Sequence, residues 1–187
     1  MQEDALKWNQ KHLEHPMPQS PSDLLVHFMP LLKKQKYKYA LDLACGNGRN
    51  SKFLAKNGFE CEGVDISDIA LQMSEGTKNL HLICTDLDNF RPAPNRYDVI
   101  LNFYFLNRDL FPSIIHALKA GGIFMLETFI KEADGFNSSQ IIDEKILEHN
   151  ELDEIFSDFR ILHKQSSYIT RREGMKAKII SFVAQKP

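Results

Sequence analysis

The chain has 187 residues, of which 43% are hydrophobic and 26% charged, and its formal net charge is −2 at pH 7. This length predicts one domain with a sizeable core and is too short for two full domains. The near-neutral charge disfavours nucleic acid and anionic membranes as partners, because both attract strongly basic surfaces. The sequence starts without a basic, apolar leader and has no run of membrane-spanning length, so we expect a cytoplasmic protein.

The cysteines and histidines give no sign of a metal or redox centre. Cys45, Cys61 and Cys84 are odd in number, form no Cys-x-x-Cys pair and lie in or beside apolar runs. We interpret them as small buried residues in a reducing compartment. His12 and His15 have helical spacing, but no third ligand stands at metal-site spacing from them. The sequence therefore predicts no metal site.

Strand-like and helix-like segments alternate through the middle of the chain, as in a parallel α/β sheet. We expect strands at residues 39–44, 60–64, 80–84, 98–103 and 123–126. Helices are expected at residues 50–57, after a cap at Ser67 or Asp68, and on the run through Ile114 and Leu118 that the pair Gly121-Gly122 ends. The crossover between the third and fourth strands contains two prolines and is expected to be abbreviated.

The last third of the chain differs in character. Residues 131–150 are polar and loop-like, 151–158 suit a short helix, and 160–164 and 178–184 have the composition of two further strands. Residues 171–174 lie between these strands and predict a terminal antiparallel hairpin. The predicted fold class is α/β, a doubly wound and mostly parallel seven-stranded sheet with a C-terminal antiparallel hairpin.

A glycine turn follows the first strand, and an acid stands just before it. The sequence runs Asp42-Leu43-Ala44-Cys45-Gly46-Asn47-Gly48. A dinucleotide site brings such a turn and a helix N-terminus against a pyrophosphate, where an acid would act against binding. A ligand that carries an ammonium in place of a phosphate would instead find an acceptor in Asp42, directly or through water.

Together these features resemble the class I S-adenosylmethionine-dependent methyltransferases, a Rossmann-like fold, over roughly residues 38 to 185. The turn departs from the family pattern Asp/Glu-x-Gly-x-Gly-x-Gly only in having Ala44 at the first glycine. Further matching signals are Asp65 after the second strand, Asp86 with Leu87 after the third, and the glycine pair before the fifth. Within this superfamily, residues 45–51 are similar to the small methyltransferases of the tellurite-resistance type.

The resemblance implies S-adenosyl-L-methionine as the cofactor. It places Asp65 at the ribose hydroxyls and Asp86 with Leu87 at the adenine, and Asp88 stays open as an alternative to Asp86. Arg49 is a candidate for the cofactor carboxylate. The cofactor-binding residues that we expect are Asp42, Ala44, Gly46, Gly48, Arg49, Asp65, Ile66, Asp86, Leu87 and Asn102.

The residues that handle the methyl acceptor are not assigned by the sequence. Four candidates lie where this fold presents side chains to the reacting methyl group, namely Asn102, Tyr104, Arg108 and Glu127. For Arg108 a surface helix start is an equal alternative, and the aromatic run at residues 103–105 is also typical of core. No tuned general base and no separate substrate domain are evident, which favours a small, already nucleophilic acceptor such as a chalcogen oxyanion or a thiol.

Two other functions stay open at this point. One is a non-catalytic module that binds S-adenosylmethionine, and the other is an NAD(P)-linked reductase, which the acid at Asp42 disfavours. The oligomeric state is not indicated. Residues 1–22 form an N-terminal segment in which Trp8 precedes a proline-rich stretch. We expect this segment to be a lid that packs through Trp8 on the methyltransferase domain of residues 23–187.

Overall fold

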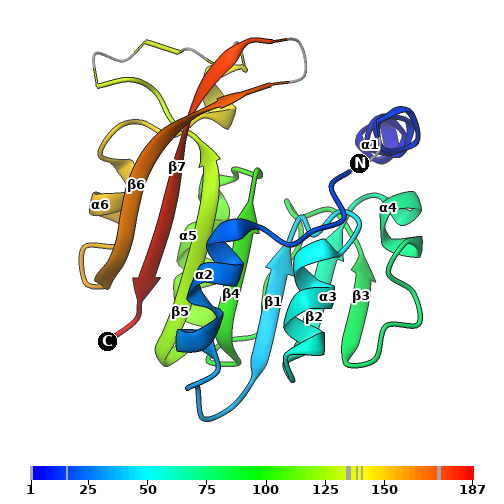
Figure 1. Cartoon of the computed structure of the whole chain (residues 1–187), viewed down its shortest axis with the longest axis vertical. Helices are drawn as coiled ribbons and strands as arrows, with labels where there is room; N and C mark the ends of the chain where they lie inside the picture. Colours follow the sequence, from blue (N-terminus) through cyan, green and yellow to red (C-terminus); the bar gives the residue numbers. More distant parts are fainter. Residues whose placement is uncertain (1, 16, 134–135, 138, 140, 172–173) are drawn as a thin grey trace.

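The computed structural model describes residues 2–15, 17–133, 136–137, 139, 141–171 and 174–187. The described strands are β1 (Tyr39–Leu43), β2 (Glu60–Asp65), β3 (Leu80–Cys84), β4 (Tyr97–Phe103), β5 (Leu118–Phe129), β6 (Arg160–Thr170) and β7 (Lys176–Gln185). They form one sheet in the order β3-β2-β1-β4-β5-β7-β6 (Figure 1). β7 is antiparallel to both of its neighbours, and the other adjacent pairs are parallel. The predicted fold class is confirmed.

Helices cover both faces of this sheet. The described helices are α1 (Gln2–Glu14), α2 (Asp23–Leu32), α3 (Arg49–Lys56), α4 (Asp68–Gln72), α5 (Phe111–Ala117), α6 (Glu151–Ile155) and two 3-10 turns at Arg108–Leu110 and Asp143–Lys145. α2 and α3 lie on one face, and α5 and α6 lie on the other (Figure 1). No helix in the described part of the chain is long and apolar enough to cross a membrane.

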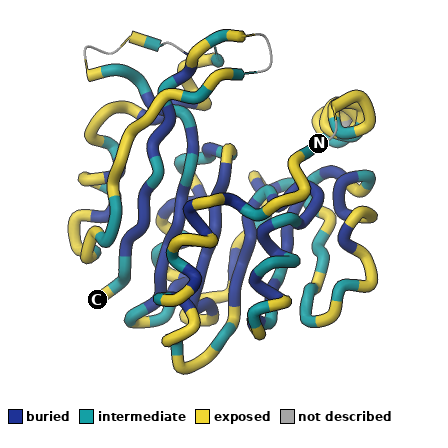
Figure 2. Tube along the Cα trace, in the orientation of Figure 1, coloured by how far each residue is buried: buried dark blue, intermediate teal, exposed yellow. Residues whose placement is uncertain are grey.

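The core follows from the alternation of side chains along the central strands. In β4, Val99 and Leu101 pack under α2 and α3, whereas Ile100 packs under α5 with Phe124 and Phe156. All five side chains are almost fully buried, and Figure 2 shows the same burial along the central strands. Helices therefore cover both faces of the middle of the sheet, and a binding site has to lie at the ends of its strands.

The predicted boundary between the third expected helix and the fifth strand is wrong. Helix α5 ends at Ala117, Leu118 is already extended, and Gly121 and Gly122 lie inside β5. The register between β4 and β5 shifts at this point, so the glycine pair forms a bulge. A Cβ at Gly122 would lie 2.8 Å from the carbonyl oxygen of Lys119, which explains the glycine in a strand.

Two further expectations need correction. β6 extends to Thr170 rather than ending at Lys164, and the expected turn at 171–174 lies partly outside the described residues. Cys45 and Cys61 are buried as predicted, but Cys84 is exposed. The reason is that β3 is an edge strand, with a neighbour on one side only.

Candidate active site

The glycine turn after β1 lies at the carboxyl edge of the sheet, between the ends of β2 and β4. Gly46 and Gly48 have φ values of +55° and +65°, in the left-handed region that favours glycine. Gly48 is also the residue before α3, and a Cβ there would lie 2.3 Å from the Ser74 hydroxyl oxygen. The tight turn thus requires both glycines.

Ala44 stands where the family pattern has its first glycine, and it too is left-handed, with φ of +54°. An L-residue in this conformation costs about 1 to 2 kcal/mol. The structure accommodates alanine at this position at the expense of local strain, which is typical of functional sites.

Asp42 is a buried acid inside the sheet. Its side chain is 2% exposed, and Ser51 of α3 donates a hydrogen bond of 2.6 Å to its Oδ2. Burial raises the pKa of Asp42 from 3.8 to about 7, and the hydrogen bond from Ser51 opposes this rise. A cation brought to the turn would favour the ionised form of Asp42. The residue is therefore suited to meet an ammonium group.

Asp65 ends β2 and joins the turn to the next helix. Its two carboxylate oxygens accept backbone N–H groups, Oδ2 from Gly46 at 2.7 Å and Oδ1 from Ser67 at 2.9 Å. Ser67 caps α4 through its hydroxyl group, which accepts from the N–H of Ala70, as one of the two predicted caps. Ile66 lies between these residues and is half-buried. An ionised carboxylate still has room for two hydroxyl donors beyond these bonds.

The loop after β3 contains the two acids that the sequence left open. Asp88 is exposed and accepts a hydrogen bond of 2.8 Å from the side chain of Asn107. Asp86 is half-buried, and Leu87 beside it is 5% exposed. Asp86 accepts the backbone N–H of Asp88 at 3.0 Å, and the choice between these two acids for a ligand stays a prediction.

Near the end of β4, the side-chain amide oxygen of Asn102 is buried without a hydrogen-bond donor among the described residues. Asn102 is 1% exposed, and its Oδ1 accepts no hydrogen bond from the described residues. Leaving such an acceptor unpaired costs about 1 to 3 kcal/mol, which calls for an explanation. Asn102 is the register partner of Leu43 at the end of β1, next to the glycine turn. The orphaned oxygen thus lies buried beside the ends of these two strands.

A cleft of about 190 Å³ opens at this edge. Its lining includes the predicted residues Asp42, Ala44, Gly46, Arg49 and Tyr104. It also includes residues that the sequence analysis did not single out for the site, Met17, Pro18, Cys45, Asn47, Asn50 and Phe103. Of these, Cys45 and Asn47 lie within the turn motif, so the motif itself could have predicted that they line the site.

Residues 17–22 form a strap across the turn, visible in Figure 1 as the segment that crosses the top of β1. The carbonyl oxygen of Pro18 accepts a hydrogen bond from Asn47, and that of Ser20 accepts one from Arg49. The N–H of Ser22 donates to the side chain of Asn50 at 2.8 Å. Arg49 is therefore engaged by the strap in this conformation.

Helix α1 lies beside the other side of the site, above α4 (Figure 1). Asn9 accepts a hydrogen bond from the hydroxyl of Ser67 and donates one to Asp68, both at 2.6 Å. Burial lowers the pKa of His12, and the nearby charge of Asp65 opposes this. The expected packing of Trp8 on the domain is wrong, because Trp8 is 38% exposed and stacks on His12 of its own helix.

Tyr104 and Glu127 form a pair at the ends of β4 and β5. The N–H of Tyr104 donates to the carbonyl oxygen of Glu127, and its hydroxyl donates to the Glu127 carboxylate, both at 2.7 Å. Tyr104 has φ of +57°, in the left-handed region. Burial and the neighbouring carboxylate raise the pKa of the Tyr104 phenol well above its ordinary value, so it remains a donor.

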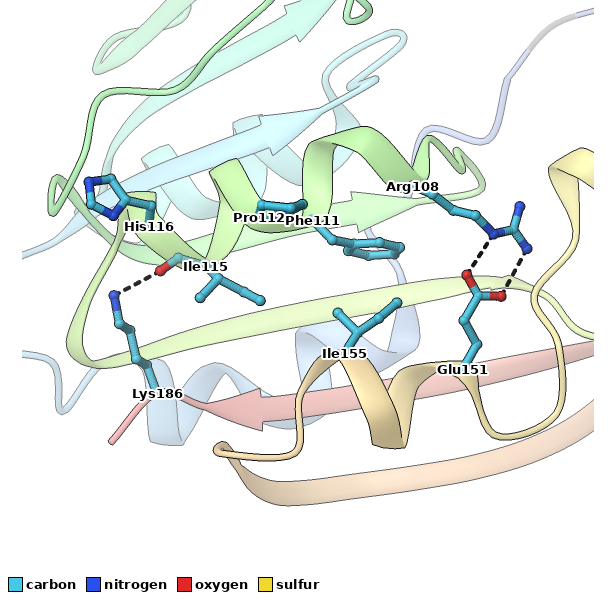
Figure 3. A pocket seen from close by; sticks show the side chains of 8 residues that line it. All are labelled: Arg108, Phe111, Pro112, Ile115, His116, Glu151, Ile155 and Lys186. Carbon is cyan, nitrogen blue, oxygen red and sulfur yellow. Dashed lines mark hydrogen bonds and ion pairs between the residues drawn. The ribbon is translucent and has the colours of Figure 1, made fainter.

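Arg108 does not reach this cleft. It lines a larger, mostly apolar cavity of about 710 Å³ between α5 and α6, where its Nε and Nη2 donate to the two carboxylate oxygens of Glu151 (Figure 3). It also donates to the carbonyl oxygens of Glu144 and Ile146. The surface helix start that the sequence left as the alternative is observed, and Arg108 fixes the segment before α6.

No group of three or more His, Cys, Asp or Glu side chains in the described part of the chain is arranged to hold a metal ion.

Comparison with known proteins agrees with this geometry. A family model described as a methyltransferase domain matches residues 13–173. The protein named "Probable S-adenosyl-L-methionine-dependent methyltransferase TehB" from Haemophilus influenzae is 36% identical over 86 residues, 42% of this chain and 30% of that protein. YqeM from Bacillus subtilis, a methyltransferase by name, is 29% identical over 119 residues, 56% of this chain and 48% of that protein. The chain thus spans less than half the length of these relatives.

Solved structures share the fold. The crystal structure of TehB from Haemophilus influenzae matches with a TM-score of 0.74 at 19% identity, over 95% of this chain and 66% of that chain. The 1,6-didemethyltoxoflavin-N1-methyltransferase of Burkholderia thailandensis, solved with S-adenosylhomocysteine, matches with a TM-score of 0.62 at 15% identity, over 88% and 78% of the two chains.

The sheet order, with β7 antiparallel, and the acid before the glycine turn define the class of S-adenosylmethionine-dependent methyltransferase folds. The family model covers most of the chain, and the chain therefore belongs to the methyltransferase domain family.

Proposed function

We propose that this domain binds S-adenosyl-L-methionine at the carboxyl edge of the sheet and transfers its methyl group to a small-molecule acceptor. The observation that carries the proposal is the set of buried acceptors around the left-handed turn, Asp42, Asp65 and Asn102, at the ends of β1, β2 and β4. A ligand with an ammonium and two ribose hydroxyls would supply a donor to the unpaired Oδ1 of Asn102 and further donors to the two carboxylates.

The residues present fit this cofactor. The orphaned Oδ1 of Asn102 and the ionised Asp42 would accept from its amino-acid end, and Asp65 from the ribose. Asp86 and Leu87 would hold the adenine, with Ile66 beside them. The cofactor supplies a methyl group already activated on a sulfonium. The protein contributes alignment, which can lower the barrier by several kcal/mol (about 7 to 11 for well-oriented groups).

The strap has to move for the cofactor to enter. The cleft measures about 190 Å³, whereas ligand sites for small molecules measure roughly 300 to 1,000 Å³. Met17 fills part of this space, because a Cβ at Gly46 would lie 2.9 Å from its sulfur atom. We therefore propose that residues 1–22 act as a lid that opens and closes over the cofactor.

The acceptor is proposed to be small, such as a thiol or a chalcogen oxyanion. The cleft is bounded by the strap and the end of β4, and such an enclosed site suits a small molecule better than a polymer. A thiolate or an oxyanion reacts with a sulfonium with little help from a general base, whereas a neutral thiol must also lose its proton. Phe103 and Tyr104 line the cleft, and we propose that the acceptor binds beside them.

The proposal is tested by binding and turnover measured separately. We expect calorimetry to show S-adenosylmethionine binding, and chromatography to show S-adenosylhomocysteine when tellurite, selenite and a panel of thiols are offered as acceptors. Binding of the cofactor without turnover on any acceptor would identify a non-catalytic binding module. Binding of NAD in place of S-adenosylmethionine would identify a reductase and overturn the proposal.

The lid makes its own prediction. Asn9→Ala removes both hydrogen bonds between α1 and the start of α4, and we expect about tenfold weaker cofactor affinity with little change in global unfolding. Limited proteolysis should cleave residues 2–15 faster in this variant. Gln10→Ala is the matched control, because Gln10 bonds only to Glu14 of the same helix among the contacts described here. Equal cofactor affinity in Asn9→Ala and wild type would refute the lid.

A further inference from the structure

Tyr104 and Glu127 are joined by two hydrogen bonds, one from the backbone N–H and one from the hydroxyl of Tyr104. Tyr104 is held to Glu127 at both its backbone N–H and its hydroxyl, and this double tie maintains a left-handed backbone that a tyrosine rarely adopts. Such strain persists where the surroundings over-determine a residue, and it is concentrated at active sites. The strained conformation places the ring in the lining of the cleft, with 41% of the residue exposed.

The chemistry of the pair is that of a proton acceptor. The phenol donates to Glu127 Oε1, and a carboxylate with one such donor keeps further lone pairs for another donor. Burial and the neighbouring Glu127 raise the pKa of the phenol, so the proton stays on Tyr104 and the hydroxyl is the donor of this hydrogen bond. The ring of Tyr104 packs edge-on against Phe129, 5.7 Å between centroids, which fixes its direction.

We propose that Glu127, oriented by Tyr104, takes the proton of the methyl acceptor, and that the acceptor is therefore a small neutral thiol rather than an oxyanion. This inference rests on the proposed function. A lone pair of the thiol sulfur forms the new bond to the methyl carbon while the methyl–sulfonium bond breaks. Its electron pair returns to the donor sulfur, giving a neutral thioether, and the S–H proton passes to a Glu127 oxygen and then to water.

A thiol matches this carboxylate better than other acceptors that carry a proton. An ordinary thiol has a pKa of about 8.5, so it gives up its proton more readily than an ammonium with a pKa of about 10. An oxyanion is repelled by the carboxylate. The charged residues in the lining of the cleft are Asp42 and Arg49, and the guanidinium of Arg49 binds the strap carbonyl of Ser20. Glu127 borders the cleft through its hydrogen bond to the lining residue Tyr104.

The test is Glu127→Gln, which keeps an acceptor for the Tyr104 hydroxyl and the shape of the side chain. With saturating cofactor at pH 7.5, we expect about 100-fold lower kcat/KM for thiols. The loss should shrink as the pH rises toward the thiol pKa, because a free thiolate needs no base. Across thiols of graded pKa, the rate of the variant should depend on acidity more steeply than that of wild type. Tyr104→Phe should show the same pH dependence with a smaller loss, as a positioning residue.

Further measurements separate this inference from the proposed function. Calorimetry should give equal S-adenosylmethionine affinity for wild type and Glu127→Gln, and thermal unfolding should match. Glu75→Gln, at an exposed residue after α4, is the control and should leave the activity unchanged. If wild type binds the cofactor but Glu127→Gln methylates thiols with an unchanged pH profile, the inference about Glu127 fails and the proposed function stands. The same holds if wild type prefers tellurite or selenite as the acceptor. If wild type binds no cofactor, the proposed function fails.

Discussion

Asp42→Asn is expected to make the protein more stable and worse at binding its cofactor. The carboxyl group has a pKa raised to about 7 by burial, so above this pH the fold contains a buried charge that it disfavours. Removing that charge should stabilise the folded state by roughly 4 kcal/mol at pH 8. The Ser51 hydroxyl can donate to the asparagine oxygen as it does to Asp42. Losing the charge opposite an ammonium should weaken cofactor binding by about 10- to 100-fold.

The pH dependence distinguishes this explanation from a simple packing change. A carboxyl group whose pKa is raised on folding stabilises the protein fully below its unfolded pKa of about 3.8, and this contribution is lost as the pH rises to about 7. The stability difference between variant and wild type should therefore be small near pH 4, grow to pH 7 and then stay constant. Urea unfolding at a series of pH values measures it, and parallel curves would contradict the explanation.

Asp98→Asn provides the matched control for this prediction. Asp98 is also buried, but it accepts from Lys119 at 2.8 Å and from the N–H of Tyr39 at 3.0 Å. Removing its charge leaves a lysine without its partner, so the same substitution should destabilise the protein. Opposite signs at two buried aspartates would show that Asp42 is retained for function and Asp98 for structure.

The sequence predicted best what is decided by local chemistry. An apolar strand, two glycines and an acid at fixed positions specify the turn at residues 44–48, because the left-handed backbone and the strand end are local requirements. Local chemistry alone also explains why the prediction for the glycine pair at residues 121–122 is wrong. A glycine pair is a helix-stop signal locally, and only the register with β4 shows that it forms a bulge inside β5.

Two of the missed side-chain contacts join residues that are distant in sequence. Glu151, which binds Arg108, lies 43 residues further on, and Glu127 lies 23 residues after Tyr104. No spacing rule connects such pairs, since the fold alone brings them together. The same limit applies to the strap, where backbone carbonyls rather than side chains meet the turn. Every residue type has a backbone carbonyl oxygen, so the sequence does not show which of them will accept a hydrogen bond from the turn.

Asp65→Ala is expected to abolish measurable cofactor binding at micromolar concentrations. Two ribose hydroxyls lose a charged acceptor, and each such bond contributes about 1.5 to 3 kcal/mol, so affinity should fall by a factor on the order of 100 or more. The variant also leaves the N–H groups of Gly46 and Ser67 without their partner. Each orphaned donor costs about 1 to 3 kcal/mol, and the loss of stability must be measured beside the loss of binding.

A modified ligand separates these two effects of the substitution. Wild type should bind S-adenosylhomocysteine more tightly than its 2′-deoxy analogue, because Asp65 accepts from the missing hydroxyl. In Asp65→Asn, which retains one oxygen for a backbone N–H, this preference should shrink while general affinity also falls. A collapsed turn would weaken both ligands equally and leave their ratio unchanged. The ratio therefore reports contact with the ribose, and a wild-type ratio near one would show that Asp65 serves only to hold the turn.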